Sequence, residues 1–284
     1  MLPFGERVRR AIASTGPLCV GIDPAASLLD AWGLSDDAAG LRAFGLGCVE
    51  AVSGVVPVVK PQVAFFERHG AAGMAAYEEV VAAAQAAGLL VIADAKRGDI
   101  GSTTEAYADA WFRGPFAADA LTATPYVGLD ALWPMADAAR ATGRGLVVVV
   151  SSSNPEGRTL QHAVTEDGRS VERSLLDEIA RWNREELADE ARRADTAPLG
   201  SAGAVVGAVR GGAPVEGLED LGGIVLAPGL GAQGARVEDV ARRFAGCPTG
   251  SVLPAVSRGV QADGERGMRN AARRLLDALA GALS

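Results

Sequence analysis

Two kinds of segment alternate along most of this 284-residue chain. Short apolar runs rich in β-branched residues are followed by longer alanine-rich stretches whose apolar residues recur at helical spacing. Continuous apolar runs are typical of strands buried on both faces, and strands that alternate with helices form parallel sheets. The predicted strands cover residues 18–23, 56–63, 89–96, 120–126, 145–150, 204–209, 223–227 and 252–256.

Eight strands that alternate with helices favour a closed barrel over an open sheet, so we predict an α/β fold of the (β/α)8, or TIM-barrel, class. Such a barrel takes about 250 residues as one domain, and residues 1–284 are therefore predicted to form a single domain. The longest stretch predicted to be irregular, 154–170, follows the fifth strand. The clearest helical patterns cover residues 74–87, 129–141, 171–194 and 266–283.

Polar residues follow most of the predicted strands, and barrel active sites lie at the carboxyl ends of the strands. Any one of these residues could simply mark a strand that reaches solvent. Their convergence on one barrel mouth nevertheless predicts a functional site there. They are Asp23, Lys60, Gln62, Asp94, Lys96, Asp99, Thr124, Ser257 and Arg258, together with segments 151–154 and 228–233.

The segment IADAKRGDIGSTTEAYA, residues 92–108, carries the most specific of these patterns. Asp94 and Lys96 are two apart on a predicted strand, so both side chains should point to one face. If that face is the barrel interior, the pair lies in a poorly solvated place and needs further partners, for which Lys60 and Asp99 are available. The alternative is an ion-pair network that only holds the barrel together. Buried pairs seldom add stability, which favours a functional role.

Lysine is scarce in this chain. Of its 27 basic residues only Lys60 and Lys96 are lysines, which leaves 25 arginines by subtraction. A genome biased toward arginine codons would explain the ratio. Arginine does not release a proton in proteins, however, whereas lysine can, so a site that needs both a cation and an exchangeable proton cannot replace lysine with arginine.

The ends of the last two strands have the chemistry of an anion site. Glycines in PGLGAQG, residues 228–234, would let backbone N–H groups approach a ligand closely, and Arg258 offers a planar cationic fork. TIM barrels frequently bind phosphate after strands seven and eight. Taken alone, the glycines would equally fit an ordinary turn between a strand and a helix.

Segment 92–108 resembles the DxKxxDI signature of the orotidine 5′-phosphate decarboxylases. Other segments, from residue 19 to residue 259, resemble further motifs of that family and occur in the family's order. DAKRGDI and KPQVAFFE are most similar to the longer bacterial branch of the family, type 2. These segments are CVGIDP at 19–24, VKPQVAFFE at 59–67, SNP at 153–155, PGLGAQG at 228–234 and SRG at 257–259.

The resemblance implies decarboxylation of orotidine 5′-monophosphate (OMP) to UMP and CO2, the last step of de novo UMP synthesis, without metal or organic cofactor. It also implies a homodimer in which Asp99, Ile100 and Thr103 enter the neighbouring subunit's site. The catalytic residues it implies are Lys60, Asp94, Lys96 and Asp99. The substrate-binding residues it implies are Asp23, Ile100, Thr103, Ser153, Pro228, Gly229, Gln233 and Arg258.

The chemistry of this reaction suits the two lysines. Loss of CO2 from C6 of the orotate ring leaves an electron pair in the ring plane, where the ring's π system cannot accept it. A fixed ammonium beside C6 would stabilise that charge and then supply a proton, which makes Lys96 the candidate cation and proton donor. Asp94 would lie near the departing carboxylate. Lys60 would keep Asp94 ionised and bind a ribose hydroxyl, and Asp23 would accept a hydrogen bond from the ribose.

Composition argues against several other classes. A net charge of −8 and a pI near 4.9 disfavour a nucleic-acid partner. No apolar stretch approaches the roughly 18 residues of a membrane span, and the first residues lack the apolar core of a signal peptide, so a cytoplasmic location is expected. The three scattered cysteines, Cys19, Cys48 and Cys247, indicate neither a zinc site nor a disulfide framework.

Two other functions remain open at this point. One is a metal-dependent sugar-phosphate enzyme on a similar barrel, with Asp94 as a magnesium ligand, although a magnesium site usually needs several oxygens. The other is a non-catalytic nucleotide-binding or scaffold protein, which the joint presence of Lys60, Asp94, Lys96 and Asp99 disfavours. Activity in the presence of a chelator separates the first function from a metal-free decarboxylase, and turnover of OMP separates the second.

Overall fold

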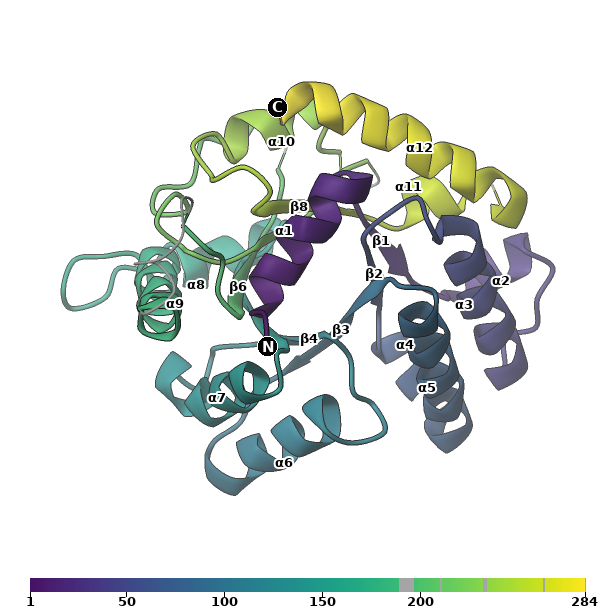
Figure 1. The fold of residues 1–284 in the computed structure, drawn as a ribbon, viewed down its shortest axis with the longest axis horizontal. Coiled ribbons are helices and arrows are strands. Elements are labelled where there is room, and N and C mark those ends of the chain that lie inside the picture. Colours follow the sequence, from purple (N-terminus) through teal and green to yellow (C-terminus); the bar gives the residue numbers. More distant parts are fainter. Residues whose placement is uncertain (189–196, 210, 232–233, 263, 284) are drawn as a thin grey trace.

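Eight parallel strands close into a barrel in the order of the sequence, which confirms the predicted (β/α)8 class (Figure 1). The computed structural model describes residues 1–188, 197–209, 211–231, 234–262 and 264–283. Pairing of Cys19 with Ala255 joins the first strand to the last and completes the ring. The strands are β1 Cys19–Ile22, β2 Val58–Pro61, β3 Leu90–Arg97, β4 Ala120–Ala123, β5 Gly145–Ser151, β6 Ala202–Val206, β7 Val225–Pro228 and β8 Val252–Val256.

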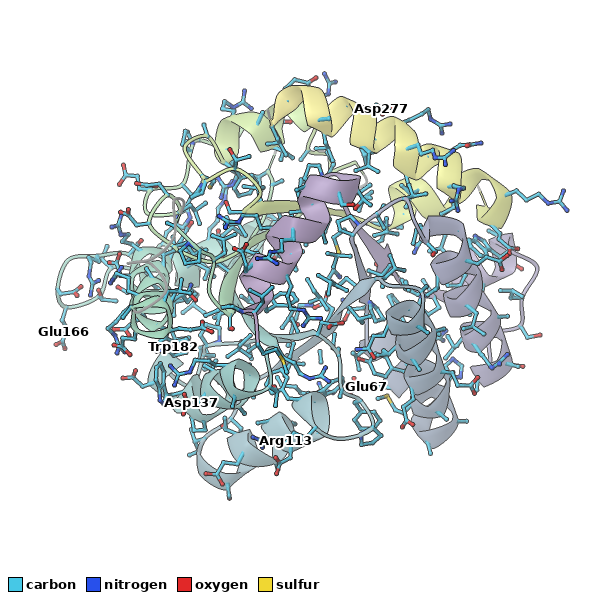
Figure 2. All side chains as sticks on the ribbon, in the orientation of Figure 1. Glu67, Arg113, Asp137, Glu166, Trp182 and Asp277 are labelled. Carbon is cyan, nitrogen blue, oxygen red and sulfur yellow. The ribbon has the colours of Figure 1, made fainter. Side chains whose placement is uncertain are left out.

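Helices surround the barrel and carry exposed charged side chains such as Asp137 and Asp277, whereas the exposed Arg113 and Glu166 lie in connecting segments (Figure 2). The helices are α1 Phe4–Thr15, α2 Ala26–Ala31, α3 Ala38–Val52, α4 Ala64–Glu67, α5 Gly70–Ala86, α6 Gly101–Phe112, α7 Trp133–Ala141, α8 Arg158–Gln161, α9 Val171–Leu187, α10 Val237–Arg243, α11 Arg258–Gln261 and α12 Gly264–Ala282. Two short 3-10 helices, η1 Leu129–Leu132 and η2 Pro155–Gly157, complete the set within the described residues.

Some predicted bounds were wrong for local reasons. Strand β4 ends at Ala123 rather than at Tyr126, because Pro125 lacks an N–H group and restricts the residue before it. The helix predicted over 129–141 is divided into η1 and α7, and Pro134 lies in the first turn of α7. Helix α9 covers the first part of the predicted helix 171–194, whose end falls outside the described residues.

The stretch 154–170 is not irregular, contrary to the prediction. It contains η2 and α8, followed by a small hairpin in which Val164 and Ser170 form an antiparallel bridge. Pro155 starts the first of these turns, a position at which proline's missing N–H is not needed. The hairpin is closed by the Thr165 amide, which donates to the Arg169 carbonyl at 2.8 Å.

Helix α1 closes the amino-terminal end of the barrel and crosses its centre in Figure 1. Phe4 and Val8 are fully buried there, in one cluster with interior side chains such as Cys19, Val58 and Ile92. The fit is close, because a Cβ added at Gly145 would lie 2.2 Å from the Phe4 ring. This floor leaves the carboxyl ends of the strands as the open end of the barrel.

Candidate active site

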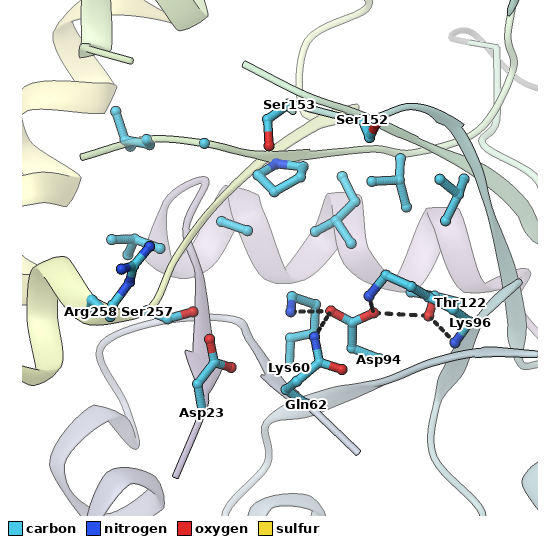
Figure 3. Close-up of a pocket in the computed structure, with 18 residues that line it drawn as sticks. Asp23, Lys60, Gln62, Asp94, Lys96, Thr122, Ser152, Ser153, Ser257 and Arg258 are labelled. Atoms are coloured by element: carbon cyan, nitrogen blue, oxygen red, sulfur yellow. Dashed lines mark hydrogen bonds and ion pairs between the residues drawn. The ribbon is translucent and has the colours of Figure 1, made fainter. Parts of the chain in front are cut away.

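A pocket lies at the open, carboxyl-terminal end of the barrel, as the fold predicts (Figure 3). Its polar wall comes from six strand ends, while apolar side chains such as Val149, Val205 and Leu226 form the remainder. The sequence-predicted residues that line it are Asp23, Lys60, Gln62, Asp94, Lys96, Ser153, Pro228, Gly229, Ser257 and Arg258.

The Asp94 carboxylate is the centre of a charged network at one side of this pocket (Figure 3). Lys60 Nζ lies 2.5 Å from Asp94 Oδ2, and Lys96 Nζ lies 2.5 Å from Asp94 Oδ1. Gln62 Nε2 donates to Oδ2 at 3.1 Å, and the Thr122 hydroxyl donates to Oδ1 at 3.1 Å. Each oxygen of the carboxylate therefore accepts from one ammonium and one neutral donor.

Burial and charge act in opposite directions on this network. Burial alone would raise the pKa of Asp94, but the nearby ammonium groups of Lys60 and Lys96 hold it well below its ordinary value. Burial would likewise lower the pKa of Lys60, but Asp94 and then Asp23 raise it above its ordinary value. Both groups are therefore charged at neutral pH.

The two lysines differ in their exposure to solvent. The Lys60 side chain is 9% exposed, whereas that of Lys96 is 50% exposed. The prediction that the Asp94–Lys96 pair lies in a poorly solvated place is therefore correct for Asp94 and wrong for Lys96. The Lys96 ammonium lies at the mouth of the pocket, where a ligand would cover it.

The backbone that brings Lys96 to Asp94 is not a regular strand, although the prediction assumed one. The pairing of β3 with β4 is interrupted between Ala93 and Arg97. Lys96 has a φ of 48°, the only positive φ of a non-glycine residue in the described ranges. Side chains with a Cβ rarely adopt this conformation, and such strain is often found at functional sites.

Asp23 presents an unpaired acceptor in the same pocket. Its Oδ1 atom is buried, and no protein group within the described residues donates to it. The carboxyl end of β1 fits tightly against the end of β8, since a Cβ added at Gly21 would lie 2.0 Å from Ser257 Oγ. Asp23 lies between Arg258 and the Asp94 network (Figure 3).

The segments predicted to bind an anion also line the pocket. Pro228 ends β7 and Gly229 follows it, with a φ of 120° that suits glycine. Arg258 begins α11, and Gln261 of the same helix donates to the Gly21 carbonyl at 2.6 Å, which fixes α11 against β1. Gln233, predicted to bind substrate, lies outside the described residues.

Asp99, Ile100 and Thr103 do not line the pocket of their own chain. Asp99 Oδ1 accepts from the Ile100 amide at 2.8 Å, and Ile100 is 62% exposed. Within one chain, Gln62 and Thr122 rather than Asp99 are the further partners of Asp94 beside the two lysines. All three residues thus lie outside their own chain's pocket, with Asp99 and Ile100 between β3 and α6 and Thr103 in the first turn of α6.

Thr122 is the main site residue that sequence reasoning missed. It is the polar residue of β4, an otherwise apolar strand, and that exception could have drawn attention to it. Thr124, which was predicted instead, does not line the pocket. Ser152, which belongs to the predicted segment 151–154, lines the pocket beside Ser153.

Other features give no competing site. The residues that the structure describes contain no group of three or more histidine, cysteine or acidic side chains placed to hold a metal ion. Cys19, Cys48 and Cys247 are free thiols, and burial raises the pKa of Cys19 to about 12. No helix within the described ranges is long and apolar enough to cross a membrane.

Comparison with known proteins gives a consistent result. The profile of the "Orotidine 5'-phosphate decarboxylase / HUMPS family" matches residues 16–275. The chain is 52% identical to an orotidine 5′-phosphate decarboxylase of Streptomyces coelicolor, over 92% of this chain and 90% of that protein.

Solved structures agree with the sequence comparison. A crystal structure of a Streptomyces avermitilis protein, described as an orotidine 5′-phosphate decarboxylase, is 48% identical and superposes with a TM-score of 0.87. That match covers 100% of this chain and 96% of the other. The OMP decarboxylase of Leishmania donovani is 27% identical with a TM-score of 0.77, covering 99% and 98% of the two chains.

Proposed function

Because the chain belongs to the orotidine 5′-phosphate decarboxylase / HUMPS family, we propose that its barrel pocket decarboxylates OMP through the Lys60–Asp94–Lys96 network. The protein is an enzyme, a decarboxylase of pyrimidine biosynthesis that converts OMP to UMP and CO2. The observation that carries the mechanism is the Asp94 carboxylate held between two ammonium groups, each 2.5 Å away. Residues 1–284 act as one domain in this proposal.

The order of groups along the pocket suits this nucleotide. Arg258 with Pro228 and Gly229 offers a cation and backbone groups to the phosphate. Asp23 then offers an unpaired buried oxygen to the ribose hydroxyls. Ser153 would contact the pyrimidine, and Gln233 would contribute to the phosphate end of the pocket.

Lys96 acts as cation and acid in the proposed mechanism. The C6 electron pair left by CO2 lies in the ring plane, so an ammonium beside C6 is the group that can stabilise it. Lys96 has the accessible ammonium of the two, since its side chain is half-exposed whereas that of Lys60 is buried. Transfer of one Lys96 proton to C6 then completes UMP and leaves a neutral amine, which water reprotonates.

Asp94 and Lys60 prepare the site for this step. Lys60 and Lys96 keep Asp94 ionised, as the lowered pKa of its carboxyl indicates. An ionised Asp94 beside the substrate carboxylate would repel it, and that repulsion would end when CO2 leaves. Lys60 would also donate to a ribose hydroxyl.

The proposal includes a homodimer with shared sites. Asp99, Ile100 and Thr103 do not line the pocket of their own chain and would complete the partner's. Apolar side chains are exposed on neighbouring loops after β3 and β4, with Ile100 62%, Tyr126 80% and Val127 44% exposed. A second copy of the chain would cover such a surface, which supports the dimer.

We also place the enzyme in the cytoplasm, because its cysteines are unpaired thiols. A net charge of −8 gives no support for nucleic-acid binding. OMP and UMP are thus the proposed small-molecule partners, and a second copy of the chain is the proposed protein partner.

No resident metal or cofactor is part of the proposed mechanism. Both Asp94 oxygens already accept from an ammonium and a neutral donor, so the carboxylate is poorly suited to bind a divalent cation. Dialysis against EDTA should therefore leave OMP turnover unchanged. Loss of turnover that magnesium restores would instead favour a metal-dependent enzyme.

The test of the function itself is release of CO2 from OMP by the purified chain, with Lys96→Ala as the inactive reference. Turnover by the wild type alone is the expected result. Binding of UMP without any turnover of OMP would favour the non-catalytic nucleotide-binding function. Equal turnover by both proteins would contradict the role of Lys96.

A further inference from the structure

We propose that Arg97 is a positioning residue that holds Lys96 in its strained conformation and thereby directs the Lys96 ammonium to Asp94. The inference rests on the proposed role of Lys96 and extends it to a residue outside the pocket. Arg97 does not line the pocket, so it is not a catalytic residue.

The strand is irregular at this point. Ala93 of β3 pairs with Leu121 of β4, and the next pair is Arg97 with Ala123. Between these pairs the chain advances four residues along β3 but only two along β4. The backbone groups of Ala95 and Lys96 therefore lack the ladder partners of a regular sheet. Strained residues of this kind persist only where surrounding contacts fix them.

One set of contacts fixes Lys96 from inside the barrel. The Lys96 amide donates to Thr122 Oγ1 at 2.9 Å, and the same hydroxyl donates to Asp94 Oδ1 at 3.1 Å. Thr122 thus replaces a backbone carbonyl of β4 as the acceptor of the Lys96 amide. This contact ties the conformation at Lys96 to the position of the Asp94 carboxylate.

Arg97 fixes the segment from outside. Its Nη1 atom donates to the Ala95 carbonyl at 2.9 Å, a bond that bridges Lys96 along the chain. Its Nη2 atom pairs with Glu67 of α4, and its guanidinium lies 5.8 Å from the ring of Tyr107 and 5.3 Å from that of Trp111, both in α6. The planar group is therefore held from two helices while it binds the irregular strand.

Loss of Arg97 would leave the Ala95 carbonyl without this donor and free Lys96 to relax toward an extended conformation. The Lys96 ammonium would then move away from Asp94. Asp23 follows β1 and Arg258 begins α11, so contacts to ribose and phosphate would remain. The consequence is a slower chemical step with little change in substrate binding.

The first experiment compares kcat and KM for Arg97→Met, Arg97→Lys and Glu67→Gln. Arg97→Met should lower kcat about 100-fold, the effect of a roughly 1 Å displacement at a reacting group, and change KM less than about threefold. Arg97→Lys should show a smaller decrease in kcat than Arg97→Met but should not reach the wild-type value. A lysine ammonium lacks the planar guanidinium that binds two acceptors side by side and stacks on aromatic rings. Glu67→Gln keeps the bond to Ala95 and both ring contacts, so it should remain within about threefold of wild type.

Arg113→Met is the matched control, since it removes another arginine from the end of α6 whose ion pair with Asp109 is exposed. It should have wild-type kcat. A wild-type kcat in Arg97→Met, or a loss that appears in KM rather than in kcat, would overturn the proposal.

The second experiment measures the strain directly and needs no turnover. Lys96→Ala and Lys96→Gly lose the same ammonium but differ in the Cβ, which is unfavourable at a φ of 48°. With Arg97 present, the glycine variant should melt about 2–6 °C above the alanine variant. With Arg97→Met added, this difference should fall by more than half, because the segment can relax.

An equal difference with and without Arg97 would show that Arg97 does not hold the strain. If the Arg97→Met background does not fold, the same comparison with Arg97→Lys decides the question. These melting temperatures are independent of activity, so failure of the proposed decarboxylation and failure of the Arg97 proposal are distinguishable.

Discussion

The two ends of the barrel interior are filled in opposite ways. At the amino-terminal end, α1 inserts Phe4 and Val8 among apolar side chains, and both are fully buried. At the carboxyl-terminal end, the side chains of Lys60 and Asp94 are each only 9% exposed, yet they are charged and border an open pocket. One end is thus closed by the chain's own helix, whereas the other is left open and polar.

The difference separates stability from chemistry. Burial of apolar side chains is the main favourable contribution to folding, and Phe4 and Val8 provide it at the amino-terminal end. A buried ion pair gains little net stability, because the loss of hydration offsets the attraction between the charges. The charged residues at the carboxyl-terminal end therefore contribute little to stability. The proposed reaction explains their presence better.

The largest expected effect is at the mouth. Lys96→Ala should lower kcat by about 10⁴-fold or more, since it removes both the cation and the proton donor. Lys96→Arg should not restore activity, because arginine keeps its proton. Circular dichroism and thermal unfolding should show a folded protein in both cases, as Asp94 keeps Lys60, Gln62 and Thr122. An active Lys96→Arg enzyme would remove lysine from the role of proton donor.

The second prediction concerns the open end of the barrel. It tests whether a second copy of the chain completes the pocket there, whereas the chain's own α1 closes the opposite end. Asp99→Ala and Lys96→Ala homodimers should each be nearly inactive. After mixing and subunit exchange, about half of the dimers are mixed, and each mixed dimer has one intact site of two. Activity should therefore return to roughly a quarter of wild type, if subunits exchange fully and the sites act independently.

Subunit exchange must be established by mass spectrometry before this result is interpreted. Mixed dimers without recovered activity would place Asp99 in the site of its own chain. That outcome would also leave the exposed Ile100, Tyr126 and Val127 surface without its proposed function.

The third prediction concerns the floor. Phe4→Ala should lower the free energy of unfolding by about 3–5 kcal/mol, because it opens a cavity beneath the interior strands. kcat of the folded fraction should stay at the wild-type value, since the ring lies at the opposite end of the barrel from Lys96. Urea unfolding and initial rates measure the two effects. Leu2→Ala is the control, as Leu2 is 39% exposed and should change stability little.

The fold could be predicted because most strands contain a short apolar run, a local signal that needs no knowledge of the partner strand. Strand ends and the stretch 154–170 were predicted less well, since single prolines and short turns decide them. The helical spacing of Phe4, Val8 and Ile12 is visible in the sequence. That this helix closes the barrel depends on contacts with distant strands, which no local pattern contains.

The convergence of Lys60, Asp94 and Lys96 could also be predicted, because the carboxyl ends of barrel strands meet at one mouth. The exposure of Lys96 and its left-handed backbone could not, since both depend on how β3 pairs with β4. The place of Thr122 in the network follows from the same pairing. The sharing of Asp99 between chains stays a prediction, because it depends on a second copy.

The smallest expected effect is a pH dependence that only the mouth should produce. The pKa of Asp94 is lowered, so its contribution to stability is present above the unfolded value of about 4 and is lost as the pH falls. The pKa of Lys60 is raised, so its contribution is present below about pH 10.5 and is lost as the pH rises further.

Replacing the pair with apolar residues, in Lys60→Met/Asp94→Leu, should abolish turnover but leave stability at pH 7 unchanged or higher.

The loss of both titrating groups has a measurable signature. In urea unfolding between pH 4 and pH 3, the slope of stability against pH should fall relative to wild type by up to about 1.4 kcal/mol per pH unit, the equivalent of one proton. Phe4→Ala, which weakens the other end, should keep the wild-type slope while lowering the whole curve. An unchanged slope in the double variant would mean that Asp94 and Lys60 are not coupled as their 2.5 Å contact indicates. The two ends of the barrel would then differ in composition but not in their electrostatic contribution to stability.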